Sequence, residues 1–351
     1  MRKSNYLPLI LVGCLFAWWL AAACSTQQPA PPARVEIDPA QLEMFEPLPA
    51  VIESPGNPLT EEKIALGRML YYDGRLSRTG EVSCNSCHDL ANYGVDSQPV
   101  SDGVEKKTGD RNSPTVYNAA GHFVQFWDGR APHVEEQAKG PVMNPLEMAM
   151  ASEKDVVKAL SAFPEYVTAF KKAFPEERQP VSFDNMAKAI GAFERKLVTP
   201  SRWDRFLKGD KAALTDAEKA GFNKYVEVGC QACHMGAYVG GSMYQKMGLT
   251  KPWIQTTDLG RFKVTKREED KMLFKVPSLL NVEKTGPYYH NGGVSTLEQA
   301  VKAMGEYQLG RQLKDSDVQS IITWLRTLTG EIPKEYIKQP QLPGTAASPR
   351  T

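Results

Sequence analysis

From residue 59 onward, apolar side chains recur mainly at the three- and four-residue spacing of amphipathic helices. The pattern predicts helices over residues 60–72, from residue 152 onward, and over residues 182–197. It is clearest over 317–328, where one face collects Val318, Ile321, Ile322, Leu325 and Leu328. No strong run alternates with the two-residue period of a strand. The sequence therefore predicts a mainly α fold.

Residues 73–150 follow a different pattern. They are rich in glycine, asparagine and proline, and they show little periodicity. Loops this long inside a compact domain usually carry function. We therefore expect long loops that wrap a bound group.

A faint internal repeat suggests two copies of one small helical unit. Thr60 and its following acidic residues open a helical stretch that leads towards Cys84. Thr215 and Glu218 form a capping box that opens the stretch leading into Cys230.

The N-terminus has the pattern of an export signal. Arg2 and Lys3 precede an apolar run over residues 7–23, which is shorter than the ~20 residues of a typical membrane span. Small residues before Cys24 resemble a bacterial lipobox, so we expect a lipid anchor at Cys24 and a periplasmic location. Cleavage without lipidation, or an uncleaved anchor, stays open.

The length of 351 residues allows two domains. We expect a signal over 1–24, a proline-rich tether and lead-in over 25–58, an N-terminal domain over 59–200, a C-terminal domain over 201–332 and a tail over 333–351. The formal net charge is +1, and no dense basic run occurs. The sequence therefore predicts no nucleic-acid partner.

Four of the six cysteines fall into two C-x-x-C-H motifs, which are Cys84, Cys87 and His88, and Cys230, Cys233 and His234. Two thiols on one helical turn reach the two vinyl groups of one porphyrin, and the adjacent imidazole binds the iron. A zinc site built from both pairs, or a thiol redox pair, is the alternative. A histidine after each pair, together with the export signal, favours two covalently bound haem c groups.

The second axial ligand of each haem iron determines its role. An iron with two protein ligands transfers electrons, whereas an iron with an open position can bind and convert a substrate. His122, His133, His290 and the methionines are candidates. Met304 lies on an amphipathic stretch, so by pattern alone it reads as an ordinary core residue.

Further segments carry a family resemblance. They are Arg111–Thr115, Gln125–Arg130, Glu136–Pro141, Phe274–Ser278 and Tyr289–Gly293. From about residue 45 to residue 332, the chain closely resembles the bacterial di-haem cytochrome c peroxidases. The resemblance implies two cytochrome c-like domains with one haem each, a calcium ion between them, and often a homodimer.

The resemblance also implies roles for single residues. His88 matches the proximal ligand of the peroxidatic haem, and His234 and Met304 match the two ligands of the electron-entry haem. Trp127 matches a tryptophan thought to help electrons pass between the haems, although a packed core tryptophan is an equal alternative.

Two further groups follow from the resemblance. Asn112, Thr285 and Pro287 match calcium-binding positions, and neutral oxygen donors suit Ca²⁺. Glu147 and Gln137 match the pocket that receives peroxide, where a carboxylate moves a proton between the two oxygens. The alternative is that Glu147 and Gln137 are surface residues of a loop.

One position departs from the family. Many members place a histidine in the loop after the first motif, where it blocks the peroxidatic iron until the other haem is reduced. That position here is Val104, which cannot bind iron. We expect an open peroxidatic site in the oxidised protein, with Lys106 or Lys107 as substitute ligands in a rival interpretation.

The expected function is therefore the reduction of hydrogen peroxide to water, with electrons from a small cytochrome c or cupredoxin. A di-haem electron relay with little peroxidase activity is the alternative. An enzyme that oxidises a protein side chain, like that of methylamine utilisation, is less favoured, since that enzyme carries tyrosine where Met304 stands.

Overall fold

The structure, a computed structural model, describes residues 1–3, 34–253 and 257–344. From Val35 on, the described residues form one compact unit. The expected signal segment and Cys24 lie outside the described residues. Among the helices of the described part, none has the length and apolar character that crossing a bilayer requires.

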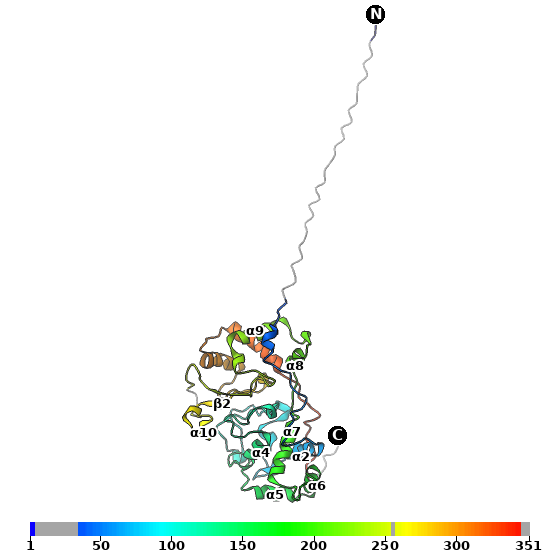
Figure 1. The fold of residues 1–351 in the computed structure, drawn as a ribbon, viewed down its shortest axis with the longest axis vertical. Coiled ribbons are helices and arrows are strands. Elements are labelled where there is room, and N and C mark those ends of the chain that lie inside the picture. Colours follow the sequence, from blue (N-terminus) through cyan, green and yellow to red (C-terminus); the bar gives the residue numbers. More distant parts are fainter. Residues whose placement is uncertain (4–33, 254–256, 345–351) are drawn as a thin grey trace. The chain divides into compact units, whose positions relative to one another are not determined.

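The described chain is rich in helix and has few strands, which confirms the predicted mainly α class. Its α-helices are α1 (Pro39–Leu42), α2 (Glu61–Tyr72), α3 (Cys84–Cys87), α4 (Val134–Met143), α5 (Glu153–Ser161), α6 (Pro164–Ala173), α7 (Phe183–Glu194), α8 (Arg202–Leu207), α9 (Asp216–Val228), α10 (Phe262–Thr265), α11 (Leu297–Ala303) and α12 (Asp315–Leu325). The strands β1 (Tyr244–Lys246) and β2 (Leu273–Lys275) pair antiparallel, with Tyr244 opposite Lys275 (Figure 1).

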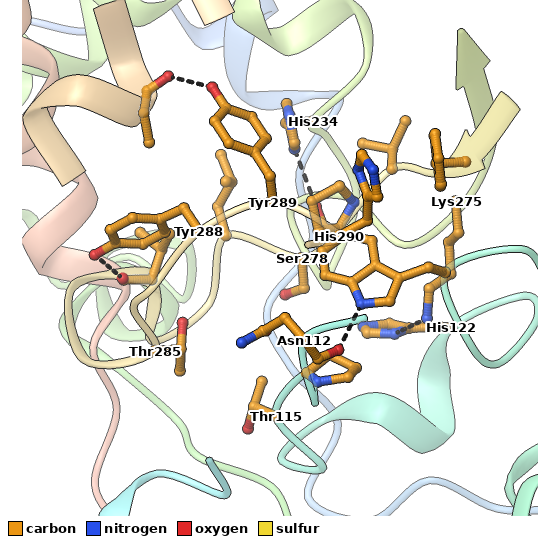
Figure 2. A pocket seen from close by; sticks show the side chains of 18 of the residues that line it. Asn112, Thr115, His122, His234, Lys275, Ser278, Thr285, Tyr288, Tyr289 and His290 are labelled. Atoms are coloured by element: carbon orange, nitrogen blue, oxygen red, sulfur yellow. Dashed lines mark hydrogen bonds between the residues drawn. The ribbon is translucent and has the colours of Figure 1, made fainter. Parts of the chain in front are cut away.

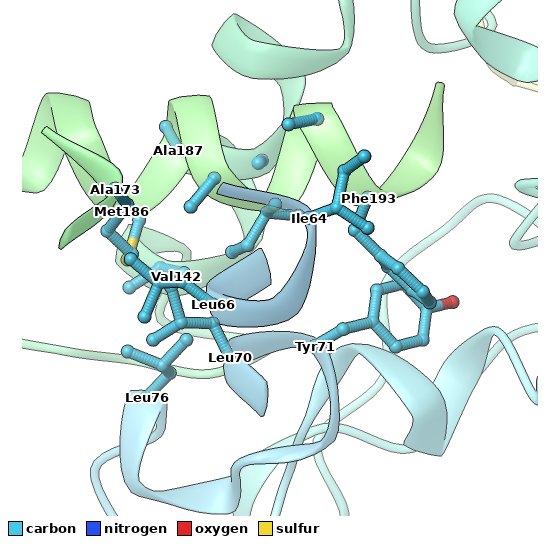
Figure 3. Packing of buried hydrophobic residues seen from close by; sticks show 14 of the residues in the cluster. Ile64, Leu66, Leu70, Tyr71, Leu76, Val142, Ala173, Met186, Ala187 and Phe193 are labelled. Carbon is cyan, nitrogen blue, oxygen red and sulfur yellow. The ribbon is translucent and has the colours of Figure 1, made fainter. Parts of the chain in front are cut away.

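Helix α2 packs against α7 at the centre of a first hydrophobic cluster, which also takes side chains from α4, α5 and α6. Leu66, Leu70 and Tyr71 are fully buried there (Figure 3). The two helices approach so closely that a Cβ atom at Gly67 would lie 1.8 Å from the carbonyl oxygen of Ala189. Only glycine allows this crossing.

Helices α9 and α12 repeat this arrangement in a second cluster. A Cβ atom at Gly221 would lie 2.2 Å from the carbonyl oxygen of Ser320. The aromatic rings of Trp203, Phe222 and Trp324 pack edge-to-face or tilted around the crossing, which adds to the apolar area that they bury.

The N-terminal caps support the same repeat. The hydroxyl of Thr60 accepts from the Lys63 N–H at the start of α2. Thr215 and Glu218 form the expected capping box at the start of α9.

Both ends of the compact unit pack against these clusters. Ile37 and Phe45, which belong to the expected lead-in, are buried in the second cluster. Ile337, in the expected tail, is buried in the first cluster, and the Tyr336 hydroxyl donates to the Phe193 carbonyl over 2.7 Å. These segments therefore contribute to the core.

The stretch 73–150 is mostly irregular but contains α4, which the pattern did not predict. Gly140 and Pro141 lie within the last turns of α4. Both residues disfavour a helix interior, which hid the helix in the sequence.

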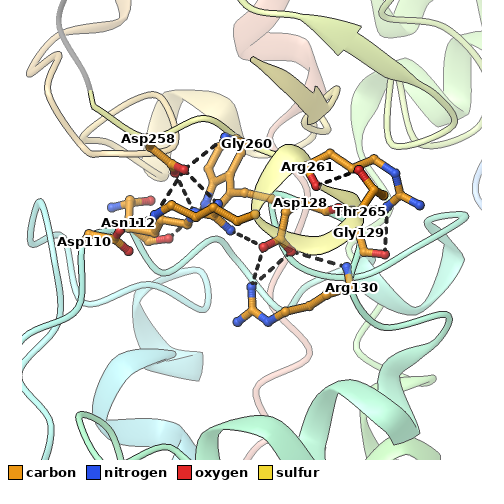
Figure 4. A network of polar contacts seen from close by, with 12 residues as sticks. Asp110, Asn112, Asp128, Gly129, Arg130, Asp258, Gly260, Arg261 and Thr265 are labelled. Carbon is orange, nitrogen blue, oxygen red and sulfur yellow. Dashed lines mark hydrogen bonds and ion pairs between the residues drawn. The ribbon is translucent and has the colours of Figure 1, made fainter. Parts of the chain in front are cut away.

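An ionic network with a buried centre joins three of the loops (Figure 4). Arg111 forms ion pairs of 2.6 Å with both Asp128 and Asp258. Lys263 connects Asp258 with Asp110. Burial alone would raise the pKa of Asp258, but Arg111 outweighs it and lowers that pKa to about 2. The network fixes the backbone next to Asn112 and Trp127.

The pKa of Asp258 predicts how its contribution to stability depends on pH. A carboxyl with a lowered pKa stabilises the fold above its unfolded-state pKa, and this stabilisation disappears as pH falls towards the folded-state value. Asp258→Asn should lower the free energy of unfolding at pH 7 by about 2 kcal/mol. The deficit should shrink as pH falls from about 4 to about 2.

Urea unfolding across this pH range measures the effect. Asp110→Asn is the matched control, because Asp110 is 69% exposed and a surface pair contributes about 0–1 kcal/mol. A deficit that does not change with pH would contradict the assignment.

Candidate functional site

One cavity of about 360 Å³ collects most of the residues that the sequence singled out. Residues from both hydrophobic halves of the compact unit line it (Figure 2). The predicted site residues in its lining are His88, Asn112, Trp127, Gln137, Glu147, Cys230, Cys233, His234, Thr285, Pro287 and Met304.

The first motif forms a single helical turn, α3, that carries Cys84 and Cys87. Ser83 and Ser86 form a capping box at its start, and His88 follows as its C-cap. The buried Tyr71 hydroxyl donates to the His88 carbonyl over 2.8 Å. Burial lowers the pKa of His88, so its imidazole is neutral, as metal ligation requires.

The second motif forms a different kind of turn but is held by the same tyrosine contact. Cys230 begins a 3₁₀ turn directly after Gly229, which ends α9 in the left-handed conformation at φ +103°. The Tyr225 hydroxyl donates to the His234 carbonyl. The Nδ1 atom of His234 lies 3.1 Å from the carbonyl oxygen of Pro277, and burial lowers its pKa to about 4.

This contact assigns the two ring nitrogens of His234. A neutral imidazole that donates from Nδ1 keeps Nε2 as its electron-pair donor, which is how a second partner fixes a metal-ligating histidine. Residue type gives no signal for the Pro277 contact, because every residue has a carbonyl group.

The cysteines of the two motifs are free thiols within the described part of the chain. The four described cysteines form no disulfide, and burial raises the pKa of Cys87 to about 11 and of Cys230 to about 12. Within the described ranges, no three His, Cys, Asp or Glu side chains gather as a metal site.

Met304 begins a π-helical turn, Met304–Gln308, directly after α11. It lines the cavity and packs against a small cluster of Met247, Trp253 and Phe274. Single π turns inside helices are frequent at functional sites.

The other candidate histidines lie in different environments. His133 is the N-cap residue of α4, half-exposed and paired with Glu135. His290 is buried in the cavity wall, where it stacks on Phe274 with ring centroids 4.2 Å apart. His122 also lines the cavity.

Trp127 lies in the same wall. Its Nε1 atom donates to the Asn112 carbonyl over 2.9 Å, and its own carbonyl accepts from the Lys275 N–H over 2.8 Å. Its ring meets that of His290 edge-on. Trp127 therefore borders the cavity and is partly buried.

The three expected calcium positions, Asn112, Thr285 and Pro287, line one cavity. The Asn112 side chain donates to the Gln98 carbonyl over 2.9 Å, which uses its amide donor and not its oxygen acceptor. These residues offer neutral oxygens only.

Gln137 on α4 and Glu147 after α4 also share the cavity. Asn144 donates to Glu147 Oε1 over 2.6 Å. Burial raises the pKa of Glu147, although the Asn144 hydrogen bond and Arg130 oppose the shift. Glu147 is therefore a partly buried side chain that a hydrogen bond from Asn144 fixes in place, and it is not a free surface side chain.

The loop that carries Val104 contacts the backbone of Glu147. The Val104 N–H donates to the Glu147 carbonyl over 2.7 Å, and the valine side chain is only 1% exposed. Lys106 pairs with Asp102, and Lys107 pairs with Glu105, at the surface.

Two buried charged groups in the cavity wall had no signal in the sequence. Burial raises the pKa of Glu194 on α7 to about 8, and burial lowers the pKa of Lys275 on β2 to about 8. Charged residues on a helix or a short strand usually face solvent, so their types and spacing carried no signal.

Comparison with known proteins identifies the family. A family model for di-haem cytochrome c peroxidase matches residues 61–212. The chain is 43% identical to the cytochrome c551 peroxidase of Pseudomonas aeruginosa, over 100% of this chain and 99% of that protein. It is 45% identical to the cytochrome c551 peroxidase of Nitrosomonas europaea, over 86% of this chain and 88% of that protein.

A solved structure shares the fold of this chain. The crystal structure of a MauG-like protein associated with microbial copper homeostasis superposes with a TM-score of 0.75 at 29% identity, over 84% of this chain and 97% of that one. The cavity, its two C-x-x-C-H motifs and these relatives agree, and the chain belongs to the di-haem cytochrome c peroxidase family.

Proposed function

We propose that this chain is a di-haem cytochrome c peroxidase, which reduces hydrogen peroxide to water with electrons from a small redox protein. One observation carries the proposal: two neutral motif histidines share a cavity with a partly buried acid, Glu147, and an amide, Gln137. An electron relay has no need of such an acid–amide pair.

Each half of the compact unit would hold one haem c. We assign the N-terminal haem to Cys84, Cys87 and His88 in residues 59–200, and the C-terminal haem to Cys230, Cys233 and His234 in residues 201–332. Two hydrophobic clusters, one mainly in each range, support two cytochrome c-like domains. The irregular parts of 73–150 would serve as the wrapping loops.

The haems supply iron centres that take up and release single electrons, and the reaction balances as H₂O₂ + 2 e⁻ + 2 H⁺ → 2 H₂O. We assign Met304 as the second ligand of the C-terminal haem. A thioether ligand raises the reduction potential, which makes this haem suited to accept electrons from a donor.

The N-terminal side of the cavity would receive the peroxide. The Gln137 amide would hold it by hydrogen bonds. The Glu147 carboxylate would take a proton from one peroxide oxygen and return it to the other, so that the second oxygen leaves as water. Asn144 holds Glu147 Oε1 in place for this transfer.

Trp127 would assist electron transfer between the two haem sites. Its position in the cavity wall and its hydrogen bond to the Asn112 carbonyl support this role over simple packing.

We propose that the peroxide site is open when the protein is fully oxidised. The loop position expected to carry a blocking histidine holds a buried valine, Val104. The lysines that could replace it, Lys106 and Lys107, are engaged in ion pairs at the surface. No redox-triggered movement of this loop is then needed.

A calcium ion would bind at Asn112, Thr285 and Pro287, with water completing its oxygen shell. Metal analysis of the dialysed protein should find one calcium per chain, and the absence of calcium would exclude the site.

The exported form would be periplasmic, with Cys24 lipidated and the chain free to pair as a homodimer. The mass of the mature N-terminus tests the anchor, since an unmodified N-terminus would exclude lipidation.

The proposed open site makes a kinetic prediction. The fully oxidised protein should reduce peroxide at once when mixed with a reduced small cytochrome c, and one-electron pre-reduction should leave the rate unchanged. Initial rates of donor oxidation, with and without pre-reduction, measure this. Activity only after pre-reduction would show that another ligand blocks the iron, and inactivity in both states would favour the electron relay.

The raised pKa of Glu147 makes a second prediction. The proton-accepting carboxylate form is populated only above that pKa, so kcat/KM for peroxide should fall as pH drops through a value higher than that of an ordinary glutamate. Glu147→Gln should lower kcat/KM about a hundred- to ten-thousandfold and remove this pH dependence.

Glu153→Gln, at the start of α5, is the control, since Glu153 is exposed outside the cavity. A Glu147→Gln variant that keeps both the wild-type rate and the wild-type pH profile would exclude the proton-transfer role.

A further inference from the structure

Lys275 is a buried cation whose charge is not balanced within the described chain. It ends β2, and its side chain is 7% exposed. Its Nζ atom contacts the Nδ1 atom of His122 at 3.3 Å (Figure 2). Among the described residues, no carboxylate forms an ion pair with Lys275.

His122 cannot supply the missing negative charge. It is 9% exposed, and burial together with the neighbouring Lys275 holds its pKa well below the usual range, so it is neutral. Because Nδ1 accepts from the ammonium group, the ring proton resides on Nε2. That buried Nε2 has no hydrogen-bond partner in the described part of the chain.

Two buried donors thus lie in one cavity wall: the His122 Nε2–H has no acceptor, and the Lys275 ammonium has a neutral acceptor but no negative partner in the described part of the chain. Removing an ammonium group from water is costly unless an opposite charge replaces the lost hydration. Lys275 is nevertheless buried at a position that lines the cavity. We therefore expect an anion held in the cavity to be its partner.

The position of the pair indicates which haem would provide that anion. Pro277 lies two residues after Lys275, and its carbonyl oxygen accepts a hydrogen bond from Nδ1 of His234. The His122 ring packs on Gly241, where a Cβ atom would lie 2.4 Å from its Cδ2 atom. A Cβ atom on the adjacent Gly240 would lie 3.2 Å from His234 Nδ1. Both donors therefore belong to the wall around His234.

We propose that Lys275, positioned by His122, forms an ion pair with a propionate carboxylate of the haem bound at His234. The inference rests on the proposed function only in requiring a haem at that motif, and it does not require peroxidase activity. The carboxylate supplies the missing negative charge, and the His122 Nε2–H offers a second donor in the same wall.

The ion pair has a consequence for the electron-entry haem. A fixed cation close to a haem favours its reduced form, which carries one positive charge less than its oxidised form. Lys275 therefore adds to the effect of Met304 in keeping the C-terminal haem reducible.

Spectroelectrochemical titration of the intact two-haem protein tests the proposal. Lys275→Met should lower the equilibrium constant for reduction of the C-terminal haem about tenfold or more, which corresponds to about 59 mV for one electron. The N-terminal haem should shift less. Lys275→Arg, which restores the charge, should recover most of the wild-type midpoint.

The matched control is Lys246→Met. Lys246 lies on β1 of the same two-stranded sheet, opposite Leu273, but it is exposed. Its removal should change neither midpoint by as much as Lys275→Met. Unchanged midpoints in Lys275→Met, or a shift confined to the N-terminal haem, would overturn the proposal.

Two further measurements test the proposal if the Lys275→Met variant does not fold with both haems attached. Lys275→Gln removes the charge and keeps a polar side chain, and it should lower the same midpoint. A crystal structure of the wild-type haem-loaded protein should place a propionate oxygen within 4 Å of Lys275 Nζ. Propionates turned away from Lys275 would exclude the ion pair. Because neither measurement uses peroxide, an inactive enzyme would not affect the result.

Discussion

The site depends on one contact that occurs twice: a buried tyrosine hydroxyl donates to the carbonyl of the histidine that ends each C-x-x-C-H motif. Tyr71 comes from α2, and Tyr225 comes from α9. Each helix is fixed in turn by a crossing so close that it requires glycine, at Gly67 and at Gly221. Through these tyrosine contacts, the two packed cores fix the turns that carry the C-x-x-C-H motifs. The turns in turn fix the orientation of the motif cysteines and histidines.

The second constraint is the low polarity of the cavity that these turns face. Burial keeps both motif imidazoles neutral, and it raises the pKa values of the Cys87 and Cys230 thiols. The same burial raises the pKa of Glu147, so a carboxyl group becomes useful for proton transfer. It also makes the lone charge of Lys275 costly, which is why a haem carboxylate is its expected partner.

Local patterns in the sequence were sufficient to predict the central helices of the two cores. The apolar stripe over 317–328 corresponds to α12, and residues 60–72 and 182–197 correspond to α2 and α7. The helix α4 was missed because Gly140 and Pro141 mask it. At the site, residue types identified the haem motifs, but the roles of Trp127, Glu147 and Met304 came from family resemblance. The Pro277 carbonyl and the Lys275–His122 contact had no local signal, since both arise only when distant segments meet.

We propose that the two haem sites act as one unit, in which the haem bound at His234 passes its electron to the haem bound at His88. A stopped-flow experiment on the fully reduced protein tests it directly. One equivalent of hydrogen peroxide should oxidise both haems of a chain, because each peroxide consumes two electrons. Oxidation of the N-terminal haem alone, with the C-terminal haem left reduced, would show that the two sites do not act as one unit.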